Sequence, residues 1–355
     1  MIVILQPNYP HYREEFFQEL QKKVRGIDLF SYQEEKASIR QGFKLNSFSS
    51  KVSAWEYRGF LINSPFAMLK MKYDTLVLML HFGHLTTWLL LLTKWLHRKK
   101  IILWGQGISV KRYLKEEKKP DWKLKWMIKL ADGVWFYMDK EYLQWRTIFP
   151  KKAMVALGNS LSGVEDMIAY VPKESTAELK HKYGINQKRI FIFCARFESQ
   201  YRRTDLLEQL IEKLDSQTNG FIIIGAGRYK PDFSIYKNVY DFGAVYDTSI
   251  KRELFAIADM YLQPGWVGLS IVEAMAYGKP ICTFKRSKDT LQCVEYSYIE
   301  DGVNGLIFGD LDDALGKLSN ISDEEIKEMG QAAKNTASKH TPALMAKNAI
   351  SIIHE

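Results

Sequence analysis

The sequence of 355 residues is poor in cysteine, has no repeat or low-complexity segment, and lacks a long uninterrupted apolar run. Its three cysteines, Cys194, Cys282 and Cys293, have no metal-ligand spacing and cannot all pair, so we expect reduced thiols in a cytosolic protein. The first ten residues, MIVILQPNYP, have neither the basic start nor the cleavage site of a signal peptide, and they predict a first strand.

The longest apolar stretch, residues 75–95, is interrupted by His81, Gly83, His84 and Lys94. A membrane-spanning helix needs about 20 predominantly apolar residues. We therefore expect a buried strand over 75–80, a loop at 81–84 and a helix over 85–96, with a spanning helix as the alternative.

The net charge of +9 is concentrated in one window, residues 94–129. This window holds twelve lysines and arginines against three acids, and it is interleaved with tryptophan and tyrosine. Such a composition favours the anionic surface of a cytoplasmic membrane leaflet. Nucleic-acid binding and an ordinary solvated basic face are the alternatives. We predict the anionic membrane surface as a partner and no nucleic acid.

Strand and helix patterns alternate, which predicts an α/β protein with parallel sheets covered by helices. The strands expected in the first half are 2–5, 75–80, 101–104, 133–136 and 154–156. Those expected in the second half are 190–194, 220–224, 239–242, 260–262 and 280–284. The length favours two domains, and we place them at 1–165 and 166–340. A final helix within 341–355 is expected to pack back on the first domain.

Short glycine motifs follow four of the expected strands. They are GQG (105–107), GAGR (225–228), GA (243–244) and PGWVGLS (264–270). Ligands of open parallel sheets bind beyond the carboxyl ends of the strands. A single glycine after a strand is only a turn signal, but four in corresponding positions predict a binding edge.

The last motif leads into a short apolar helix, 271–277, with one carboxylate, Glu273, in its first turn. Gly265 and Gly268 let a ligand approach the backbone, and Ser270 is expected to cap the helix, whose amino end favours an anion. A buried carboxylate needs a partner. Glu273 is therefore expected to accept hydrogen bonds from vicinal hydroxyls, such as those of a ribose.

Three arginines are placed to hold a phosphate. Arg196 directly follows a strand, and Arg202 and Arg203 open the next helix. Guanidinium groups stabilise the charge of a leaving diphosphate without a metal. Because no D-x-D motif lies near the loop, we expect neither a metal nor a cofactor. Salt bridging at the surface is the alternative for these arginines.

Residues 190–310 resemble the retaining glycosyltransferases of family 4, which have the GT-B fold of two Rossmann-like, doubly wound domains with an interdomain cleft. The resemblance rests on the segments PGWVGLSIVEAMAYGKP, ARFESQYRR, GAGR and EYSYIEDGVNGLIF. In the first half it is looser. There LQPNYPHYREEFF and LWGQGIS are similar to the first-strand and acceptor-side loops of bacterial surface-polysaccharide transferases.

The resemblance implies a role for each matching residue. Glu273 would bind the ribose, and Arg196 with Arg202 or Arg203 would hold the diphosphate. Arg196, Arg202 and Gln106 would be the catalytic residues. The other donor-binding positions would be Gly265, Trp266, Gly268, Leu269, Ser270, Gly225, Gly227 and Arg228. The acceptor-side positions would be Asn8, His11, His81 and His84.

Two positions depart from the family pattern. Gly265 stands where members often have a glutamate that contacts the transferred sugar, so the identity of the sugar stays open. Gln106 stands where many members have a histidine, and glutamine is no base at neutral pH. If the reaction retains configuration, the leaving phosphate oxygen would accept the acceptor proton, and Gln106 would orient the reactants.

We therefore predict a glycosyltransferase that moves a sugar from a nucleotide-diphosphate donor, UDP before GDP, to a lipid-linked or polysaccharide acceptor. The resemblance implies bacterial capsule, O-antigen or exopolysaccharide synthesis, with the protein cytoplasmic and peripheral to the inner face of the cell membrane. The alternatives are another GT-B enzyme, such as an epimerase or a phosphorylase, a catalytically silent scaffold, and a nucleic-acid-binding protein.

Overall fold

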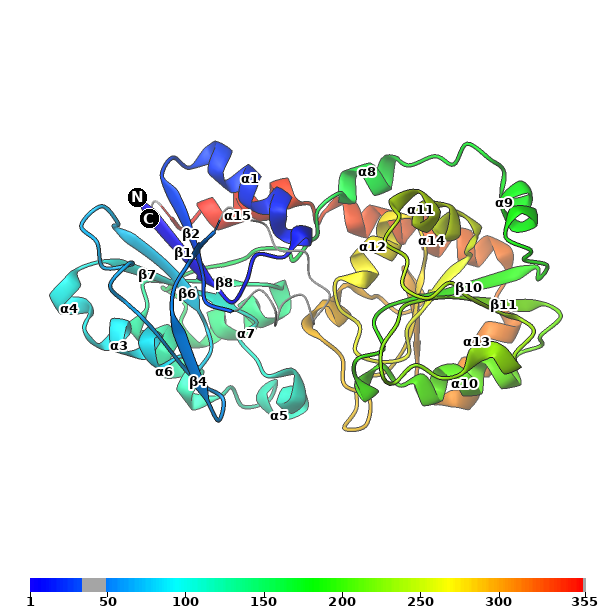
Figure 1. Cartoon of the computed structure of the whole chain (residues 1–355). Coiled ribbons are helices and arrows are strands. Elements are labelled where there is room, and N and C mark those ends of the chain that lie inside the picture. Colours follow the sequence, from blue (N-terminus) through cyan, green and yellow to red (C-terminus); the bar gives the residue numbers. More distant parts are fainter. Residues whose placement is uncertain (34–48, 354–355) are drawn as a thin grey trace. The chain divides into compact units, whose positions relative to one another are not determined.

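The computed structural model describes residues 1–33 and 49–353. The chain divides into two compact units (Figure 1). The first consists of residues 1–163 and returns at His340 to include the last helix, and the second consists of residues 164–339. The sequence analysis placed the corresponding boundaries at 165 and 340.

The first unit is built on a parallel sheet with the strand order β3-β2-β1-β6-β7-β8-β9. The strands are β1 (Ile2–Gln6), β2 (Ile27–Ser31), β3 (Ser50–Lys51), β6 (Thr75–Met79), β7 (Lys100–Gly105), β8 (Gly133–Phe136) and β9 (Ala153–Ala156). An antiparallel hairpin of β4 (Ala54–Tyr57) and β5 (Phe60–Asn63) stands apart from this sheet.

Helices cover both faces of this sheet (Figure 1). One face packs against α1 (Glu14–Lys23) and α15 (Pro342–Ile350), and the other against α3 (Leu85–Leu92), α6 (Trp122–Leu130) and α7 (Asp139–Ile148). The short helices are η1 (His11–Arg13), α4 (Lys94–His97), η2 (Val110–Arg112) and α5 (Tyr113–Glu116). The contact between α1 and α15 joins the two ends of the chain in one unit.

The second unit repeats the plan with the strand order β12-β11-β10-β13-β14-β15, again parallel. Its strands are β10 (Arg189–Cys194), β11 (Asn219–Ile224), β12 (Val239–Asp241), β13 (Met260–Leu262), β14 (Ile281–Phe284) and β15 (Gly305–Phe308). Its α-helices are α8 (Val164–Ala169), α9 (Thr176–Lys182), α10 (Thr204–Lys213), α11 (Thr248–Ile257), α12 (Ser270–Ala276), α13 (Leu311–Asn320) and α14 (Asp323–Ser338). The 3₁₀ helices are η3 (Gln200–Arg202), η4 (Phe233–Ile235) and η5 (Val294–Tyr298).

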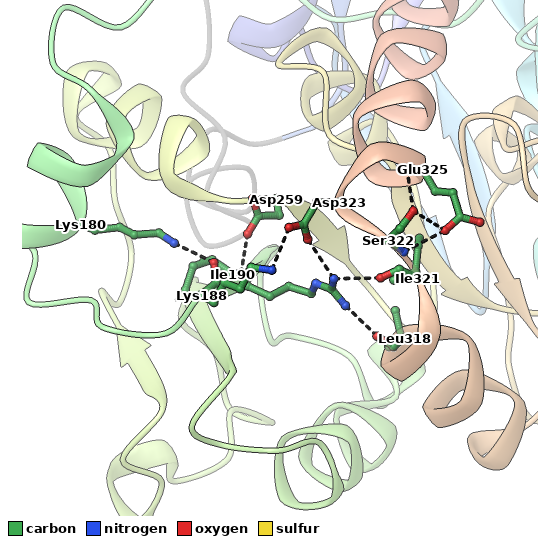
Figure 2. Close-up of polar contacts among 10 residues, drawn as sticks. Lys180, Lys188, Ile190, Asp259, Leu318, Ile321, Ser322, Asp323 and Glu325 are labelled. Carbon is green, nitrogen blue, oxygen red and sulfur yellow. Dashed lines mark hydrogen bonds and ion pairs between the residues drawn. The ribbon is translucent and has the colours of Figure 1, made fainter.

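In each sheet, an aspartate side chain links two neighbouring strands at their amino-terminal ends. In the second unit, Asp259 Oδ2 accepts a hydrogen bond from the Ile190 amide at 2.7 Å, which joins β13 to the start of β10 (Figure 2). In the first unit, Asp132 Oδ2 accepts from the Ile101 amide at 2.8 Å and joins β8 to β7. The sequence analysis predicted neither hydrogen bond, although both aspartates follow an alanine at the end of a helix.

The same edge of the second unit is held by an ion-pair network (Figure 2). Asp323 lies 2.9 Å from the Lys188 ammonium and 3.1 Å from the Arg189 guanidinium. Arg189 also donates to two carbonyls at the end of α13. Ser322 and Glu325 form a capping box that starts α14. These contacts fix the amino ends of the strands and leave the carboxyl ends to carry loops.

The predicted strands match the observed ones to within one or two residues, because buried β-branched runs between turn signals are distinctive. The missed elements include β2, β3, the β4–β5 hairpin, β15 and α14. The helix expected over 85–96 is broken at Thr93 into α3 and α4. No helix among the described residues is long and apolar enough to cross a membrane.

Candidate active site

The loop after β13 is held by a buried glutamine that the sequence analysis did not single out. Gln263 is fully buried and donates from Nε2 to the Trp266 carbonyl at 2.7 Å. Its Oε1 accepts from the hydroxyls of Tyr261 at 2.7 Å and Ser270 at 3.0 Å. One amide group thus ties the strand, the loop and the first residue of α12 together.

A second buried glutamine holds the same loop from the other side. Gln292 accepts from the Val267 amide at 2.9 Å and donates to the Phe284 carbonyl at 2.8 Å and Thr283 Oγ1 at 3.0 Å. It is fully buried. Because buried polar networks with every member bonded rigidify a structure, these two glutamines restrict the movement of the loop.

Gly265 is required by packing. A Cβ at this position would lie 2.5 Å from the Tyr201 carbonyl oxygen, closer than real Cβ atoms come to backbone. The next residue, Trp266, has a left-handed φ of +53° and stacks its ring on Tyr201 at 5.0 Å between centroids. Gly268 has no neighbour within 4 Å of its Cβ position. Close packing therefore requires a glycine at position 265, whereas the surroundings of Gly268 leave room for a side chain.

The partner of the Glu273 carboxylate is Lys251. The ammonium lies 2.6 Å from Oε1 and 2.7 Å from Oε2. Lys251 comes from α11, whose first turn is capped by Asp247. The sequence analysis expected ligand hydroxyls as the partner of Glu273 and did not predict this internal ion pair. Glu273 does lie in the first turn of α12, as predicted.

Ser270 does not cap α12, so that prediction is wrong. Leu269 occupies the cap position and makes no side-chain cap. Ser270 is the first helical residue, and its hydroxyl donates to Gln263 instead. The prediction failed because the helix begins at Ser270, one residue earlier than expected, and the serine hydroxyl donates to Gln263 at the end of the strand.

Of the two adjacent arginines, Arg202 and Arg203, only Arg203 forms an ion pair with a carboxylate among the described residues. Arg203 grips Asp205 with Nε at 2.9 Å and Nη2 at 2.7 Å, and its Nη1 donates to Thr290 Oγ1 at 2.6 Å. Arg202 donates from Nη1 to the Trp266 carbonyl at 2.7 Å. Within the described residues, Arg202 has no carboxylate partner.

Burial lowers the pKa of Arg202, and the nearby charge of Arg196 adds to this effect. An anion bound beside the two guanidinium groups would relieve both penalties. Arg196 itself is exposed and lies two residues after the end of β10. The second unit therefore presents two neighbouring guanidinium groups at the carboxyl edge of its sheet.

Cys194, the last residue of β10, lies within electrostatic reach of Lys251, Glu273 and Arg202. Burial raises the pKa of its thiol to about 11, so it is a neutral side chain at physiological pH. Burial alone would lower the pKa of Lys251, but its electrostatic interactions with Cys194 and with the Glu273 carboxylate outweigh burial and raise that pKa. Lys251 is therefore charged at physiological pH.

The glycines of GAGR are explained by close backbone contact. A Cβ on Gly225 would lie 2.0 Å from the Ala195 carbonyl oxygen, and one on Gly227 would lie 2.5 Å from the Phe197 carbonyl carbon. Both glycines have a φ of +147°. The loop after β11 thus packs against the loop that carries Arg196. Arg228 is exposed, with its guanidinium over the Tyr229 ring at 4.5 Å.

In the first unit, the loop after β7 presents Gln106. Gly107 has a φ of +73°, and a Cβ there would lie 2.6 Å from the Phe136 ring. Trp145 Nε1 donates to the Gly107 carbonyl at 2.9 Å, which fixes the turn. The half-buried Gln106 amide makes no hydrogen bond within the described part of the chain.

The first-strand loop brings Asn8 and His11 to the same edge of this sheet. Asn8 Nδ2 donates to Gln33 Oε1 at 3.0 Å. His11 is exposed at the start of η1. The next residues are anchored by Arg13, which is buried and donates to the Ser160 carbonyl at 3.1 Å.

The loop after β6 places His81 and His84 beside the β4–β5 hairpin, with ring centroids 5.0 Å apart. His84 is buried, and its ring meets Tyr32 edge to face. Burial, with a contribution from His81, lowers the pKa of His84 to about 4, so its imidazole is neutral at physiological pH. Burial also lowers the pKa of His81, while the charge of Glu56 opposes that shift.

The structure thus gathers Arg196, Arg202 and Glu273 at one sheet edge, and Gln106 with the acceptor-side residues at the corresponding edge of the other unit. Sequence reasoning missed Lys251, Gln263 and Gln292. Only Lys251 had a signal, a lysine one turn after the cap Asp247. Within the described residues, no group of three His, Cys, Asp or Glu side chains is placed to hold a metal ion.

Comparison with known proteins follows the same division. Residues 188–322 match the family model described as Glycosyl transferases group 1. The comparison with curated proteins finds no significant match. The family match therefore lies entirely within the second unit, where the loops after β10, β11 and β13 are found.

Solved structures are similar over nearly the whole chain. HepE of Anabaena in complex with UDP has 13% identity and a TM-score of 0.66, with 99% of this chain and 98% of that chain covered. The lipopolysaccharide outer core galactosyltransferase WaaB has 15% identity and a TM-score of 0.65, with 100% and 99% covered.

A putative UDP-N-acetylglucosamine 2-epimerase from Listeria monocytogenes has 9% identity and a TM-score of 0.59, with 99% and 95% covered. These likenesses show the GT-B fold, which confirms the predicted fold class of two parallel-sheet α/β domains. Together with the family match they indicate a glycosyltransferase.

Proposed function

We propose that the protein transfers a sugar from a UDP-sugar to a lipid-linked or polysaccharide acceptor, with retention of configuration and without a metal. The observation that carries the proposal is the pair of guanidinium groups after β10, beside the Lys251–Glu273 ion pair. Arg202, with no carboxylate partner in the described part of the chain, is free to bind an anion.

A nucleoside diphosphate fits this edge in chemical terms. Arg196 and Arg202 would bind the two phosphates, and the buildup of charge on the leaving group would be stabilised by both. Glu273 would accept from the ribose hydroxyls while Lys251 holds its carboxylate in place. Arg203, which is bound to Asp205 and Thr290, would position the loop of Arg202.

In the reaction, the bond between the anomeric carbon and the phosphate oxygen breaks as the acceptor oxygen attacks from the same face. The acceptor proton would pass to the departing phosphate oxygen, because the neutral Gln106 amide has no basic site. The unpaired amide of Gln106 in the first unit would orient the acceptor hydroxyl. His84 would contact the acceptor as a neutral ring.

The similar structures support the choice of donor and acceptor class. HepE binds UDP and UDP-glucose, and WaaB is a galactosyltransferase of the lipopolysaccharide outer core. We accordingly propose a cytoplasmic enzyme of surface-glycan synthesis, for capsule, O-antigen or exopolysaccharide. It would bind the inner face of the cell membrane through the basic window 94–129.

A direct test measures thermal stabilisation by UDP, GDP, ADP and CMP, each with and without a chelator. A ligand at 100 times its Kd stabilises the protein by about 2.7 kcal/mol. We expect UDP to stabilise it most, with no effect of the chelator. Stabilisation by none of the four would contradict the proposal, and stabilisation only by GDP or ADP would contradict the choice of donor.

The epimerase-like structure gives a second candidate, an enzyme that changes a UDP-sugar without transferring it. The two candidates differ in their need for an acceptor. Release of UDP from UDP-glucose or UDP-galactose that occurs only with added membrane lipid extract favours the transferase. An altered sugar formed from the donor alone favours the epimerase.

A further inference from the structure

The amino-terminal edge of the first sheet carries a basic pocket with a volume of about 980 Å³. Its polar lining consists of seven cations and one acid: Lys94, Arg98, Lys99, Lys100, Lys129, Lys151, Lys152 and Asp132. Lys100 starts β7, and Asp132 and Lys152 directly precede β8 and β9. This pocket therefore lies at the opposite sheet edge from Gln106 and His84.

Several of these cations are fixed by main-chain carbonyls. Lys99 is 6% exposed and donates to the carbonyls of Lys70 at 2.9 Å and Tyr73 at 2.6 Å. Lys100 donates to the Ile352 carbonyl at 2.8 Å, and Lys152 to the Ala131 carbonyl at 2.5 Å. Carbonyl oxygens orient an ammonium group without cancelling its charge.

The one acid in the lining, Asp132, is paired with Lys94 and also accepts from the Ile101 amide. The seven cations outnumber this one acid, and Lys94 repels Lys152. Burial lowers the pKa of Lys152, Asp132 opposes that shift, and the charge of Lys94 adds to it. A bound anion would relieve this repulsion. The pocket is thus a prearranged set of cations that suits a phosphate-bearing group.

Exposed apolar side chains lead along the helices to this pocket. Leu85, Leu89 and Leu92 follow one another at helical spacing on α3. Trp95 and Leu96 are exposed on the next helix, α4, where Trp95 is 77% exposed. Helix α6 neighbours α3 (Figure 1). It exposes Trp122 and Trp126, one turn apart. The Lys129 ammonium lies 4.8 Å from the centre of the Trp126 ring.

We infer that this pocket binds the phosphate of an anionic phospholipid while the α3–α4–α6 face lies on the bilayer. The inference rests on the membrane location in the proposed function and names the residues that achieve it. An apolar stripe ending in a cationic pocket matches the acyl chains and phosphate of one lipid. A nucleic acid would match the cations but not the leucines.

The structure also separates this pocket from the rest of the basic window. Lys115, Lys118 and Lys119 lie in and after α5, a segment that follows the carboxyl end of β7. Lys151 and Lys152 line the pocket but lie outside residues 94–129. The two groups of lysines are joined in sequence and separated by the length of β7, about 20 Å for its six residues.

Two triple variants with equal loss of charge test the inference. One removes exposed cations of the pocket, R98Q/K129Q/K151Q, and the control removes K115Q/K118Q/K119Q. Binding to vesicles of phosphatidylcholine, with and without 30% phosphatidylglycerol, is measured by sedimentation. We expect the pocket variant to lose on the order of 100-fold in affinity for the anionic vesicles, and the control less than about threefold.

A third variant, W95A, removes an apolar contact and is expected to weaken binding to both kinds of vesicle. Equal losses in the two triple variants would overturn the inference in favour of diffuse charge. Tighter binding of the wild type to RNA than to anionic vesicles would overturn it in favour of nucleic acid. Full competition by soluble glycerol phosphate would show a free-anion site instead of a lipid site.

Thermal stabilisation by UDP is measured on the same variants. The pocket variant is expected to keep it unchanged, because Arg98, Lys129 and Lys151 belong to the first unit and the proposed donor site to the second. Vesicle binding without any response to UDP would refute the proposed donor and leave the lipid pocket standing. A response to UDP without vesicle binding would do the reverse.

Discussion

Replacement of Glu273 has two consequences that the structure allows us to separate. The carboxylate is the proposed ribose ligand, and it is also the partner of the Lys251 ammonium at 2.6 Å. The side chains are 12% and 25% exposed, so neither charge is fully solvated. A loss of UDP binding in Glu273→Ala alone would therefore not identify the cause.

The two effects have different expected magnitudes. Loss of a hydrogen bond from ribose to a carboxylate costs about 1.5 to 3 kcal/mol of binding, which is roughly 10- to 150-fold in Kd. Loss of the ion pair leaves Lys251 without its counter-charge. Breaking a fully buried pair costs about 3 to 5 kcal/mol of stability, and the partial exposure here reduces this to about 2 kcal/mol.

The assay is a cycle of E273Q, K251M and the double variant, with the Kd for UDP from calorimetry and the midpoint of urea unfolding. We expect E273Q to weaken UDP binding at least tenfold. K251M should lower stability to a similar degree as E273Q but weaken UDP binding less than about threefold. The double variant should recover stability, because no unpaired charge remains.

The reasoning would be refuted by a double variant that recovers both stability and wild-type UDP affinity. Glu273 would then be a structural partner of Lys251, and the ribose would be bound elsewhere. A loss of UDP affinity in K251M as large as that in E273Q would instead make Lys251 a direct donor ligand.

Three further predictions follow from buried groups. The pKa of a histidine is near 6.5 in the unfolded chain, and that of folded His84 is about 4, so the unfolded chain binds more protons between these values. Stability therefore falls as pH falls, by about 2 kcal/mol at pH 5. The free energy of urea unfolding should differ less between pH 5 and pH 7 in His84→Gln than in the wild type, and an unchanged difference would exclude His84 as the source. Gly265→Ala drives a Cβ into the Tyr201 carbonyl, 2.5 Å away, whereas Gly268→Ala meets nothing within 4 Å; UDP binding should fall at least tenfold in the first variant relative to the second, and equal binding would show that the loop of Arg202 yields freely. Gln292→Leu leaves the Val267 amide without its 2.9 Å partner and should cost about 2 to 3 kcal/mol of stability; a midpoint of thermal unfolding within one degree of the wild type would contradict the account of the loop.

Much of the fold follows from local sequence. The runs IVILQ, TLVLM and RIFIFC are buried strands between turn signals, and each was placed to within two residues. The misses have local explanations. The longest helix, α14, begins with the capping box of Ser322 and Glu325, a signal present in the sequence but not used. The hairpin β4–β5 was missed because its residues are mostly exposed and it has no alternation of apolar and polar residues.

The proposed ligand-binding residues of the candidate site were easier to predict than the side chains that hold them in place. Glu273, Arg202 and the glycine loops could be proposed from the sequence because strand ends, glycines and isolated charges are visible in the order of residues alone. Their partners were not. Lys251 precedes Glu273 by 22 positions, and Gln292 follows the amide it holds by 25.

The sequence by itself determined two parallel α/β units, the loops that end their strands, and the excess of positive charge between residues 94 and 129. Each of these depends on the order of neighbouring residues. Only the tertiary structure decided which charges cancel. It paired Glu273 with Lys251 and Arg203 with Asp205, and within the described residues it left Arg202 without a carboxylate partner.

The tertiary structure also divided the basic window. In the folded chain, Lys151 and Lys152 line the same pocket as Lys94, Arg98 and Lys129, and the lysines in and after α5 lie elsewhere. The physical reason is the same in both cases. Electrostatic energy depends on distance in space and on burial, and a parallel sheet brings the starts of successive strands, far apart in the chain, to one edge.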